Sequence, residues 1–258
     1  MPDSATTTAV VNQKGGVGKT TTAFNVGALL AARRRVLLVD LDAQSTLSVA
    51  CGFPLGATDG LPTSYELMTD RGFDPVKAIV PTEAGPDLIP AKLALATAEL
   101  SVAAMMQREF VLKEQLAKIA DRYDHILIDC SPSLGLLTVN ALTAANKVIV
   151  PVQCEYLSMR GLVQLQNTLQ MIRENLNPGV EIEGILPTML DSRTVHAKEA
   201  VEILEENFGE LVFKSRIRKA IKFAEAPVRG TSVLKYDPGS KAASAYRDLA
   251  KEVLTHGS

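Results

Sequence analysis

Residues 11–21 read VNQKGGVGKTT, a glycine-rich run that ends in Lys-Thr-Thr. The run follows a short apolar segment at residues 9–12, typical of a buried strand, and opens a helical pattern at residues 20–33. A glycine-rich turn between a strand and a helix lets backbone N–H groups approach phosphate oxygens, and the helix N-terminus adds its positive dipole end. The run therefore predicts a phosphate-binding loop.

Two lysines give this loop its particular character. Lys19 is expected to reach the β- and γ-phosphates, with the Thr20 hydroxyl on Mg²⁺ and Thr21 on an outer phosphate. The strict pattern G-x-x-x-x-G-K-[ST] is not met, because Gln13 stands at its first glycine. A second lysine, Lys14, is badly placed for the phosphates of its own loop, so we expect it to reach a nucleotide on a facing subunit. The predicted nucleotide-binding residues are Lys14, Gly15, Gly16, Val17, Gly18, Lys19, Thr20 and Thr21.

Carboxylates follow two further apolar runs. Asp40 and Asp42 end the run that begins at residue 36, and Asp129 ends the run at residues 126–128. Because the carboxyl ends of parallel strands border the ligand crevice of an open α/β sheet, these side chains should meet near the loop. Asp129 fits a Mg²⁺-holding role, direct or through water, with Asp40 as a further candidate acting through water. Asp42 is placed to orient an attacking water.

The rest of the chain alternates strand and helix patterns. Strands are expected at 148–152 and 182–186, and helices at 136–145, 158–175, 194–207 and 240–254. This alternation predicts an α/β fold, with a doubly wound, mostly parallel sheet and helices on both faces. We expect one domain over residues 1–258, with a loop-rich excursion from the sheet at 52–91 that includes a short helix at 64–69.

Composition excludes several classes of protein. Lys+Arg is 27 and Asp+Glu is 29, so any nucleic-acid binding must come from a local patch. The three cysteines form no Cys-x-x-Cys pair, which argues against a disulfide scaffold, zinc site or redox motif. The sequence has no secretory signal and no apolar run of ~18 residues. Because the cysteines are odd in number and far apart, we expect them to be reduced and the protein to be cytoplasmic.

Taken together, the motifs resemble the ParA/Soj family of chromosome- and plasmid-partitioning ATPases, of the deviant Walker A class. The resemblance rests on KGGVGKTT at 14–21, DLDAQ at 40–44 and DCSPSLG at 129–135, and then on VPVQCEY at 150–156, TMLDSRT at 188–194 and AEAP at 224–227. It spans about residues 8–253. Ala43 replaces the family's usual proline after Asp42, and Arg218 and Ala220 stand where the family often has Pro and Asn beside the adenine.

The resemblance implies an ATPase that is monomeric without ATP and forms a sandwich homodimer with ATP and Mg²⁺. It makes Lys14, Lys19 and Asp42 the catalytic residues, with Lys14 acting across the dimer and Gly15 packing against the partner subunit. It further implies nucleoid association through non-specific double-stranded DNA binding, and a ParB-like centromere-binding protein that stimulates hydrolysis and releases the DNA.

The candidate DNA surface is basic. Five of the nine residues in 214–222, KSRIRKAIK, are Lys or Arg. If this run is helical, Lys214, Arg218 and Lys222 share one face. Basic residues of this kind give sequence-blind, salt-dependent affinity. The resemblance implies DNA contacts from this region and from the position of Arg193, so the predicted DNA contacts are Arg193, Arg216, Arg218, Lys219 and Lys222.

Two alternatives stay open on the sequence. In the first, the same nucleoid-bound ATPase positions a protein cargo; in the second, the chain is a MinD-like membrane-associated switch. The second is disfavoured because the last helical pattern reads as a packed helix rather than a basic membrane anchor. An iron–sulfur carrier role lacks the paired cysteines it needs. The first strand begins by about residue 9, so we expect no N-terminal helix-turn-helix domain.

Overall fold

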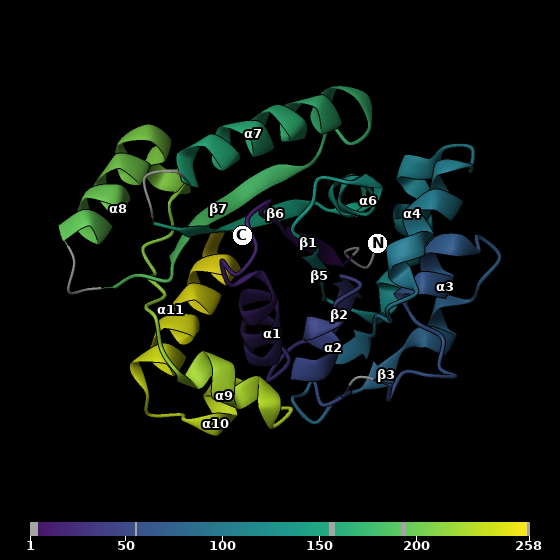
Figure 1. Cartoon of the computed structure of the whole chain (residues 1–258), viewed down its shortest axis with the longest axis horizontal. Helices are drawn as coiled ribbons and strands as arrows, with labels where there is room; N and C mark the ends of the chain where they lie inside the picture. Colours follow the sequence, from purple (N-terminus) through teal and green to yellow (C-terminus); the bar gives the residue numbers. More distant parts are fainter. Residues whose placement is uncertain (1–4, 55, 155–157, 192–194, 257–258) are drawn as a thin grey trace.

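A seven-stranded sheet forms the centre of the computed structural model, which describes residues 5–54, 56–154, 158–191 and 195–256 (Figure 1). Its strands are β1 Thr6–Val10, β2 Val36–Leu41, β3 Val80–Pro81, β4 Asp87–Ile89, β5 His125–Cys130, β6 Lys147–Gln153 and β7 Glu181–Thr188. They lie in the order β3-β4-β2-β5-β1-β6-β7, and only β3 runs antiparallel to its neighbour. The predicted mostly parallel sheet is confirmed.

Helices cover both faces of this sheet. They are α1 Lys19–Leu30, α2 Thr46–Ala50, α3 Ser64–Thr69, α4 Leu95–Ala103, α5 Val111–Ala117, α6 Leu136–Ala144, α7 Ser158–Asn175, α8 Val195–Phe208, α9 Lys222–Val228, α10 Val233–Tyr236 and α11 Lys241–His256. Short 3₁₀ turns occupy Pro75–Ala78, Arg108–Phe110, Ala120–Arg122 and Gly209–Leu211.

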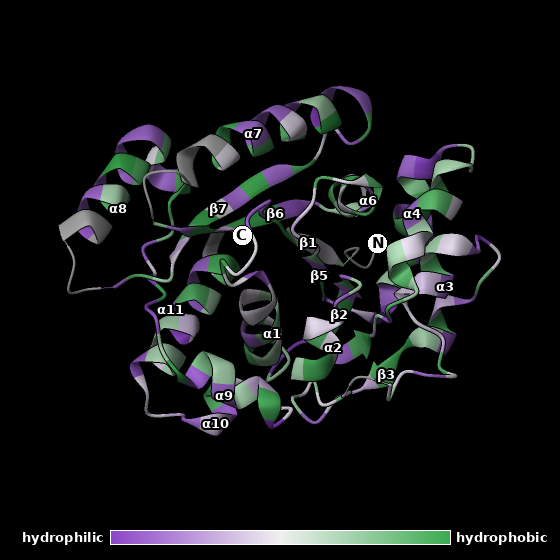
Figure 2. Cartoon of the chain, in the orientation of Figure 1, coloured by the Kyte–Doolittle hydropathy of each residue, from purple (hydrophilic) through white to green (hydrophobic). Residues whose placement is uncertain are grey.

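Strand alternation explains this layering. Successive strand residues point to opposite faces, so Leu37 and Val39 join a core with α3 to α7, whereas Val36 and Leu38 join a core with α1, α2 and α11. The outer helices α7, α8 and α11 mix hydrophilic and hydrophobic residues, as Figure 2 shows, because one side of each helix faces the sheet. No helix in the described part of the chain combines the length and apolar character needed to span a bilayer.

Part of segment 52–91 belongs to the sheet. The segment was expected as an excursion, yet β4 pairs in parallel with β2, and β3 adds an antiparallel edge. Its Pro- and Gly-rich composition concealed strands of two and three residues. The expected short helix is α3, which Thr63 and Glu66 close with a reciprocal capping box. Helices α4 and α5 were not predicted.

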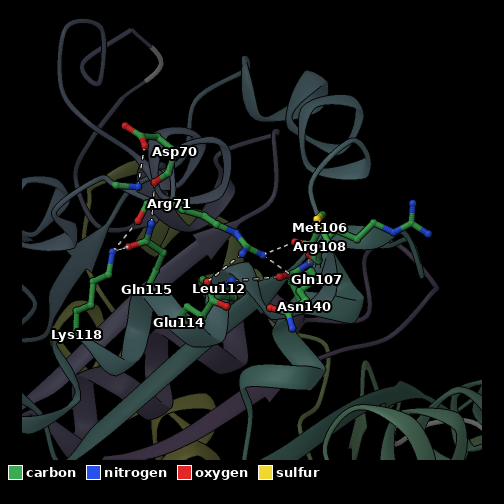
Figure 3. Close-up of polar contacts among 11 residues, drawn as sticks. Asp70, Arg71, Met106, Gln107, Arg108, Leu112, Glu114, Gln115, Lys118 and Asn140 are labelled. Carbon is green, nitrogen blue, oxygen red and sulfur yellow. Dashed lines mark hydrogen bonds and ion pairs between the residues drawn. The ribbon is translucent and has the colours of Figure 1, made fainter.

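A polar network fastens α5 and the turn before it to α6 (Figure 3). The Arg71 guanidinium donates to the carbonyl oxygens of Met106 at 2.7 Å and Gln107 at 2.9 Å. Asn140, fully buried on α6, accepts a hydrogen bond from the Leu112 N–H at 3.1 Å. Because buried backbone groups must be partnered, these side chains fix the path of the chain there.

Candidate functional site

The phosphate loop, residues 11–18, links β1 to α1 at the carboxyl edge of the sheet. Gly16 and Gly18 have φ values of 72° and 90°, in the left-handed region that favours glycine. Gly15 has no such angle, and a Cβ built on it meets nothing within 4 Å. Within the described part of the chain, therefore, no contact requires glycine at position 15.

Two side chains outside the glycine run hold the loop in place. The Asn12 amide donates to the Pro151 carbonyl at 2.7 Å and accepts from the Lys14 N–H at 2.9 Å. The Thr188 hydroxyl, at the end of β7, donates to the Val17 carbonyl at 2.8 Å. These bonds preorganise the loop backbone. Sequence reasoning assigned Asn12 and Thr188 no role, because their partners Pro151 and Val17 lie far from them along the chain.

Lys19 begins α1 with its side chain folded back over the loop. It is only 7% exposed, and its ammonium donates to the Lys14 carbonyl at 3.2 Å. Burial lowers the pKa of Lys19, and the charge of Asp129 acts in the opposite direction. Lys14 itself is exposed, while Thr20 and Thr21 are half-buried in the first turn of α1.

Asp40 and Asp129 lie side by side on neighbouring strands. They are Cα partners in the parallel pairing of β2 with β5, and both are fully buried. They share the face of Leu38 and Leu127, whose side chains pack in the core with α1. The structure thus brings together, beside the helix of the phosphate loop, two carboxylates that are 89 positions apart in sequence (129 minus 40).

The two carboxylates differ in their partners. Asp40 accepts hydrogen bonds from the Ser48 N–H at 2.8 Å, the Ser48 hydroxyl at 2.6 Å and the Asp42 N–H at 3.2 Å. Among the described residues, no donor meets hydrogen-bond geometry with either oxygen of Asp129. The Thr20 hydroxyl and the Lys19 charge are nevertheless near enough to favour its ionised form.

Burial controls the ionisation of both groups. It raises the pKa of Asp129 well above the usual range, and the neighbouring charge of Asp40 raises it further. It also raises the pKa of Asp40 to about 6, against the opposing effect of the Ser48 hydrogen bonds. Of the two, Asp129 is the carboxylate whose oxygens have no hydrogen-bond donor among the described residues.

The donor set around Asp129 fits a hard divalent cation. Mg²⁺ prefers oxygen ligands and is usually bound through one or two protein groups plus phosphate oxygens and water. The Asp129 carboxylate and the Thr20 hydroxyl, side by side at the loop, are ligands of this kind. In the described ranges no group of three or more His, Cys, Asp or Glu is arranged to hold a metal ion.

Asp42 follows β2 in a tight turn at the same edge. Its Oδ1 accepts from the Gln44 N–H at 3.0 Å, and its carbonyl accepts from the Ser45 N–H at 2.9 Å. Ser45 has a φ of 52° and begins α2 without a side-chain cap. The turn therefore holds Asp42 by backbone contacts, with its side chain half-buried.

The basic run at 214–222 is not the helix considered from the sequence, because α9 starts only at Lys222. Residues 212–219 run extended beside β7, where Phe213 N–H donates to Ile185 O at 3.0 Å and Ile217 N–H to Pro187 O at 3.0 Å. Phe213 and Ile217 are buried, so alternate side chains turn inward. The prediction that Lys214, Arg218 and Lys222 share one face of a helix is therefore wrong, because hydrogen bonds to β7 hold this segment extended despite the helical spacing of its charges.

The predicted DNA contacts fall into different environments. Arg218 and Lys219 are exposed, and neither forms an ion pair with any described residue. By contrast, Arg216 pairs with Glu205, and Lys222 pairs with a carboxylate of α9, Glu225, at 3.4 Å. Arg193 lies outside the described residues.

An open groove of about 730 Å³ is lined by residues of the 212–219 segment and of α11. Its cationic lining residues are Lys214, Arg216, Arg218, Lys219 and Lys241. Helix α11 itself is packed, with Tyr246 and Leu249 fully buried and Val253 at 7% exposure. The apolar side of the last helix is therefore used in the core, as the sequence indicated.

A preorganised glycine loop with two strand-end carboxylates, on an open parallel sheet, defines a P-loop NTPase of the deviant Walker A type. Residues 5–182 match the family model described as "AAA domain". The chain is 44% identical over 252 residues to the sporulation initiation inhibitor protein Soj of Bacillus subtilis, covering 96% of this chain and 98% of that protein. It is 42% identical over 249 residues to the chromosome partitioning protein ParA of Myxococcus xanthus, covering 95% and 86%. The chain belongs to the ParA/Soj family and is a ParA-type ATPase.

Solved structures agree with this fold. A Mycobacterium smegmatis protein described as cobyrinic acid a,c-diamide synthase, with bound ADP and magnesium, has a TM-score of 0.84 and 40% identity, covering 98% of this chain and 95% of that one. A Cyanothece McdA variant in complex with ATP has a TM-score of 0.85 at 23% identity, covering 98% and 97%, and shows the likeness of fold alone.

Proposed function

We propose that this chain is an ATP-driven switch in DNA segregation. Mg²⁺ and ATP would bind at the phosphate loop and bring two copies together, and the dimer would bind double-stranded DNA without sequence preference at the nucleoid. Hydrolysis, stimulated by a ParB-like centromere-binding protein, would release the DNA. The observation that carries the proposal is the buried, donor-free carboxylate of Asp129 beside Thr20 and the phosphate loop.

The chemistry follows from groups already in position. Lys19, whose buried ammonium donates to a loop carbonyl, would exchange that acceptor for phosphate oxygens. Thr20 and Asp129 would hold Mg²⁺, which neutralises phosphate charge when bound. Asp40 already accepts three hydrogen bonds, which leaves it at most a contact through water. Asp42 would orient the attacking water for in-line displacement.

Dimerisation is supported by two features of the loop. Among the described residues nothing lies within 4 Å of a Cβ built on Gly15, and we propose that its lack of a side chain serves a contact with the partner subunit. Lys14 is exposed next to it. We propose that Lys14 reaches the partner's nucleotide and that hydrolysis therefore depends on the dimer.

The groove beside α11 is the proposed DNA surface. Five cations line it, against two acids, Asp248 and Glu252. The Glu252 carboxylate is occupied by the N–H groups of Lys214 at 2.7 Å and Ser215 at 2.8 Å. The exposed cations Arg218 and Lys219 therefore dominate the charge of the groove, although the whole chain carries −2.

Charge reversal tests this surface. The double variant R218E/K219E should lose ATP-dependent DNA binding, because phosphate contacts supply sequence-blind affinity, and it should still bind ATP. The matched control, K77E/K113E, changes the same charge at two exposed lysines far from the groove and should bind DNA normally at moderate salt. Salt-sensitive DNA binding that survives in R218E/K219E would refute the surface.

A further inference from the structure

Ser48, a residue with no predicted role, connects the ends of two strands. It lies in the short helix α2, is 1% exposed, and donates to Asp40 through both its N–H at 2.8 Å and its hydroxyl at 2.6 Å. The same hydroxyl oxygen accepts from the Ala91 N–H at 2.9 Å, just beyond β4. One side chain thus joins the residues that follow β4 to the carboxylate near the end of β2.

The Ala91 N–H, the Ser48 hydroxyl and the Asp40 carboxylate form a series of hydrogen bonds, each with a defined donor and acceptor. The Ala91 N–H can only donate, so the Ser48 oxygen accepts there and its proton is free for Asp40. Asp40 in turn accepts from the Asp42 N–H at 3.2 Å through its other oxygen. Three donors converge on one carboxylate, and hydrogen bonds of this kind favour its ionised form.

This arrangement determines where Asp42 stands. The N-cap residue of α2, Ser45, makes no side-chain hydrogen bond to the first turn of the helix. Asp40, on β2, caps that turn instead by accepting a hydrogen bond from the Ser48 N–H. Rotation of the Asp40 carboxylate is restrained by the Ser48 hydroxyl, and the Asp42 backbone is tied to that carboxylate. Without the hydroxyl, Asp40 would keep one donor on that oxygen instead of two, and the turn carrying Asp42 would be held less tightly.

We propose that Ser48 is a positioning residue for ATP hydrolysis, acting through Asp40 to hold Asp42 where it orients the attacking water. The inference rests on the proposed function, in which Asp42 has that role. Ser48 itself touches neither nucleotide nor metal in this scheme. It sets the geometry of the turn, where a small displacement reduces turnover without weakening substrate binding.

The test compares Ser48→Ala with a matched control three residues away. Ser45 is a buried serine of the same turn, and its hydroxyl does not cap α2. Ser45→Ala therefore removes a comparable hydroxyl that does not contact Asp40. For S48A we expect kcat for ATP to fall about tenfold, with the KM for ATP and the Kd of a non-hydrolysable analogue within twofold of wild type, and S45A should match wild type. S48T, which keeps the hydroxyl, should recover most of the lost kcat. Equal kcat in S48A and wild type would overturn the proposal, as would parallel losses in S48A and S45A.

A double-mutant cycle separates this inference from the proposed function. If Ser48 acts only through Asp42, the variant D42A/S48A should hydrolyse ATP at the residual rate of D42A alone. A further fall in D42A/S48A would show that Ser48 acts elsewhere and would refute the inference. Full hydrolysis by D42A itself would instead refute the role of Asp42, and with it the proposed function.

Discussion

Replacement of Asp129 by asparagine is predicted to stabilise the ligand-free protein and abolish its Mg²⁺-dependent ATPase activity. Asparagine is nearly isosteric and uncharged, so it removes the desolvation of a fully buried carboxylate. A buried polar group without a partner costs about 1–3 kcal/mol, and a charged group costs more. The amide of asparagine also lacks a partner there, so the substitution removes only the additional cost of the charge. We therefore expect D129N to raise the free energy of unfolding by about 1 kcal/mol or more at pH 7 without ligand.

Asp40→Asn is the matched control for this prediction. Asp40 has the same burial on the adjacent strand, but its carboxylate accepts three hydrogen bonds. Its replacement should therefore give a free energy of unfolding lower than that of D129N by at least about 1.5 kcal/mol, the value of one hydrogen bond to a charged group.

Urea denaturation followed by circular dichroism, in EDTA and without nucleotide, measures both variants. Thermal shifts with Mg²⁺ and a non-hydrolysable ATP analogue then report binding, and the Mg²⁺-dependent part of the stabilisation should vanish in D129N. If ligand-free D129N unfolds at lower urea concentration than wild type, the carboxylate is stabilised by the fold and the reasoning is refuted.

Three further substitutions test other parts of the account. Asn140→Ala leaves the buried Leu112 N–H without its acceptor and should cost about 1–3 kcal/mol in urea denaturation; a loss below about 0.5 kcal/mol would contradict that role. Hydrogen bonds from Arg35 lower the pKa of Asp124 to about 2, whereas the pKa of an aspartate in the unfolded chain is about 3.9. The Arg35–Asp124 pair should therefore stabilise the fold at pH values above about 3.9, and this stabilisation should be lost as the pH falls towards 2. The Tm difference between wild type and D124N should accordingly shrink from pH 6 to pH 3, and a constant difference would be evidence against it. Gly15→Ala should unfold within about 0.5 kcal/mol of wild type yet fail to dimerise with ATP in analytical ultracentrifugation, and a normal dimer would remove Gly15 from the interface.

Local sequence patterns were enough to predict the elements that position the site. The apolar runs before Asp40 and Asp129 are strands because buried parallel strands need no polar alternation. Their period of two then turns both carboxylates towards α1. The glycine run needed no tertiary information, since its left-handed angles at Gly16 and Gly18 are a local requirement.

Features that depend on distant partners were not predicted. The basic segment 212–219 has helical spacing of its charges, yet hydrogen bonds to β7 hold it extended. The contact between Ser48 and Ala91 joins residues 43 positions apart, and no local signal announces it. The sequence placed Asp129 ahead of Asp40 as the Mg²⁺ candidate, but only the packed structure shows that Asp40 is hydrogen-bonded and that Asp129 has no donor among the described residues.

The central claim is that nucleotide state controls DNA binding through Asp129 and the phosphate loop. The most direct test is fluorescence-anisotropy binding to a random-sequence DNA duplex with ATP, with ADP and without nucleotide, each with Mg²⁺ and at two salt concentrations. We predict tight, salt-sensitive binding with ATP only, and none for D129N or K19A under any condition. Equal DNA affinity with ATP, with ADP and without nucleotide would contradict the account.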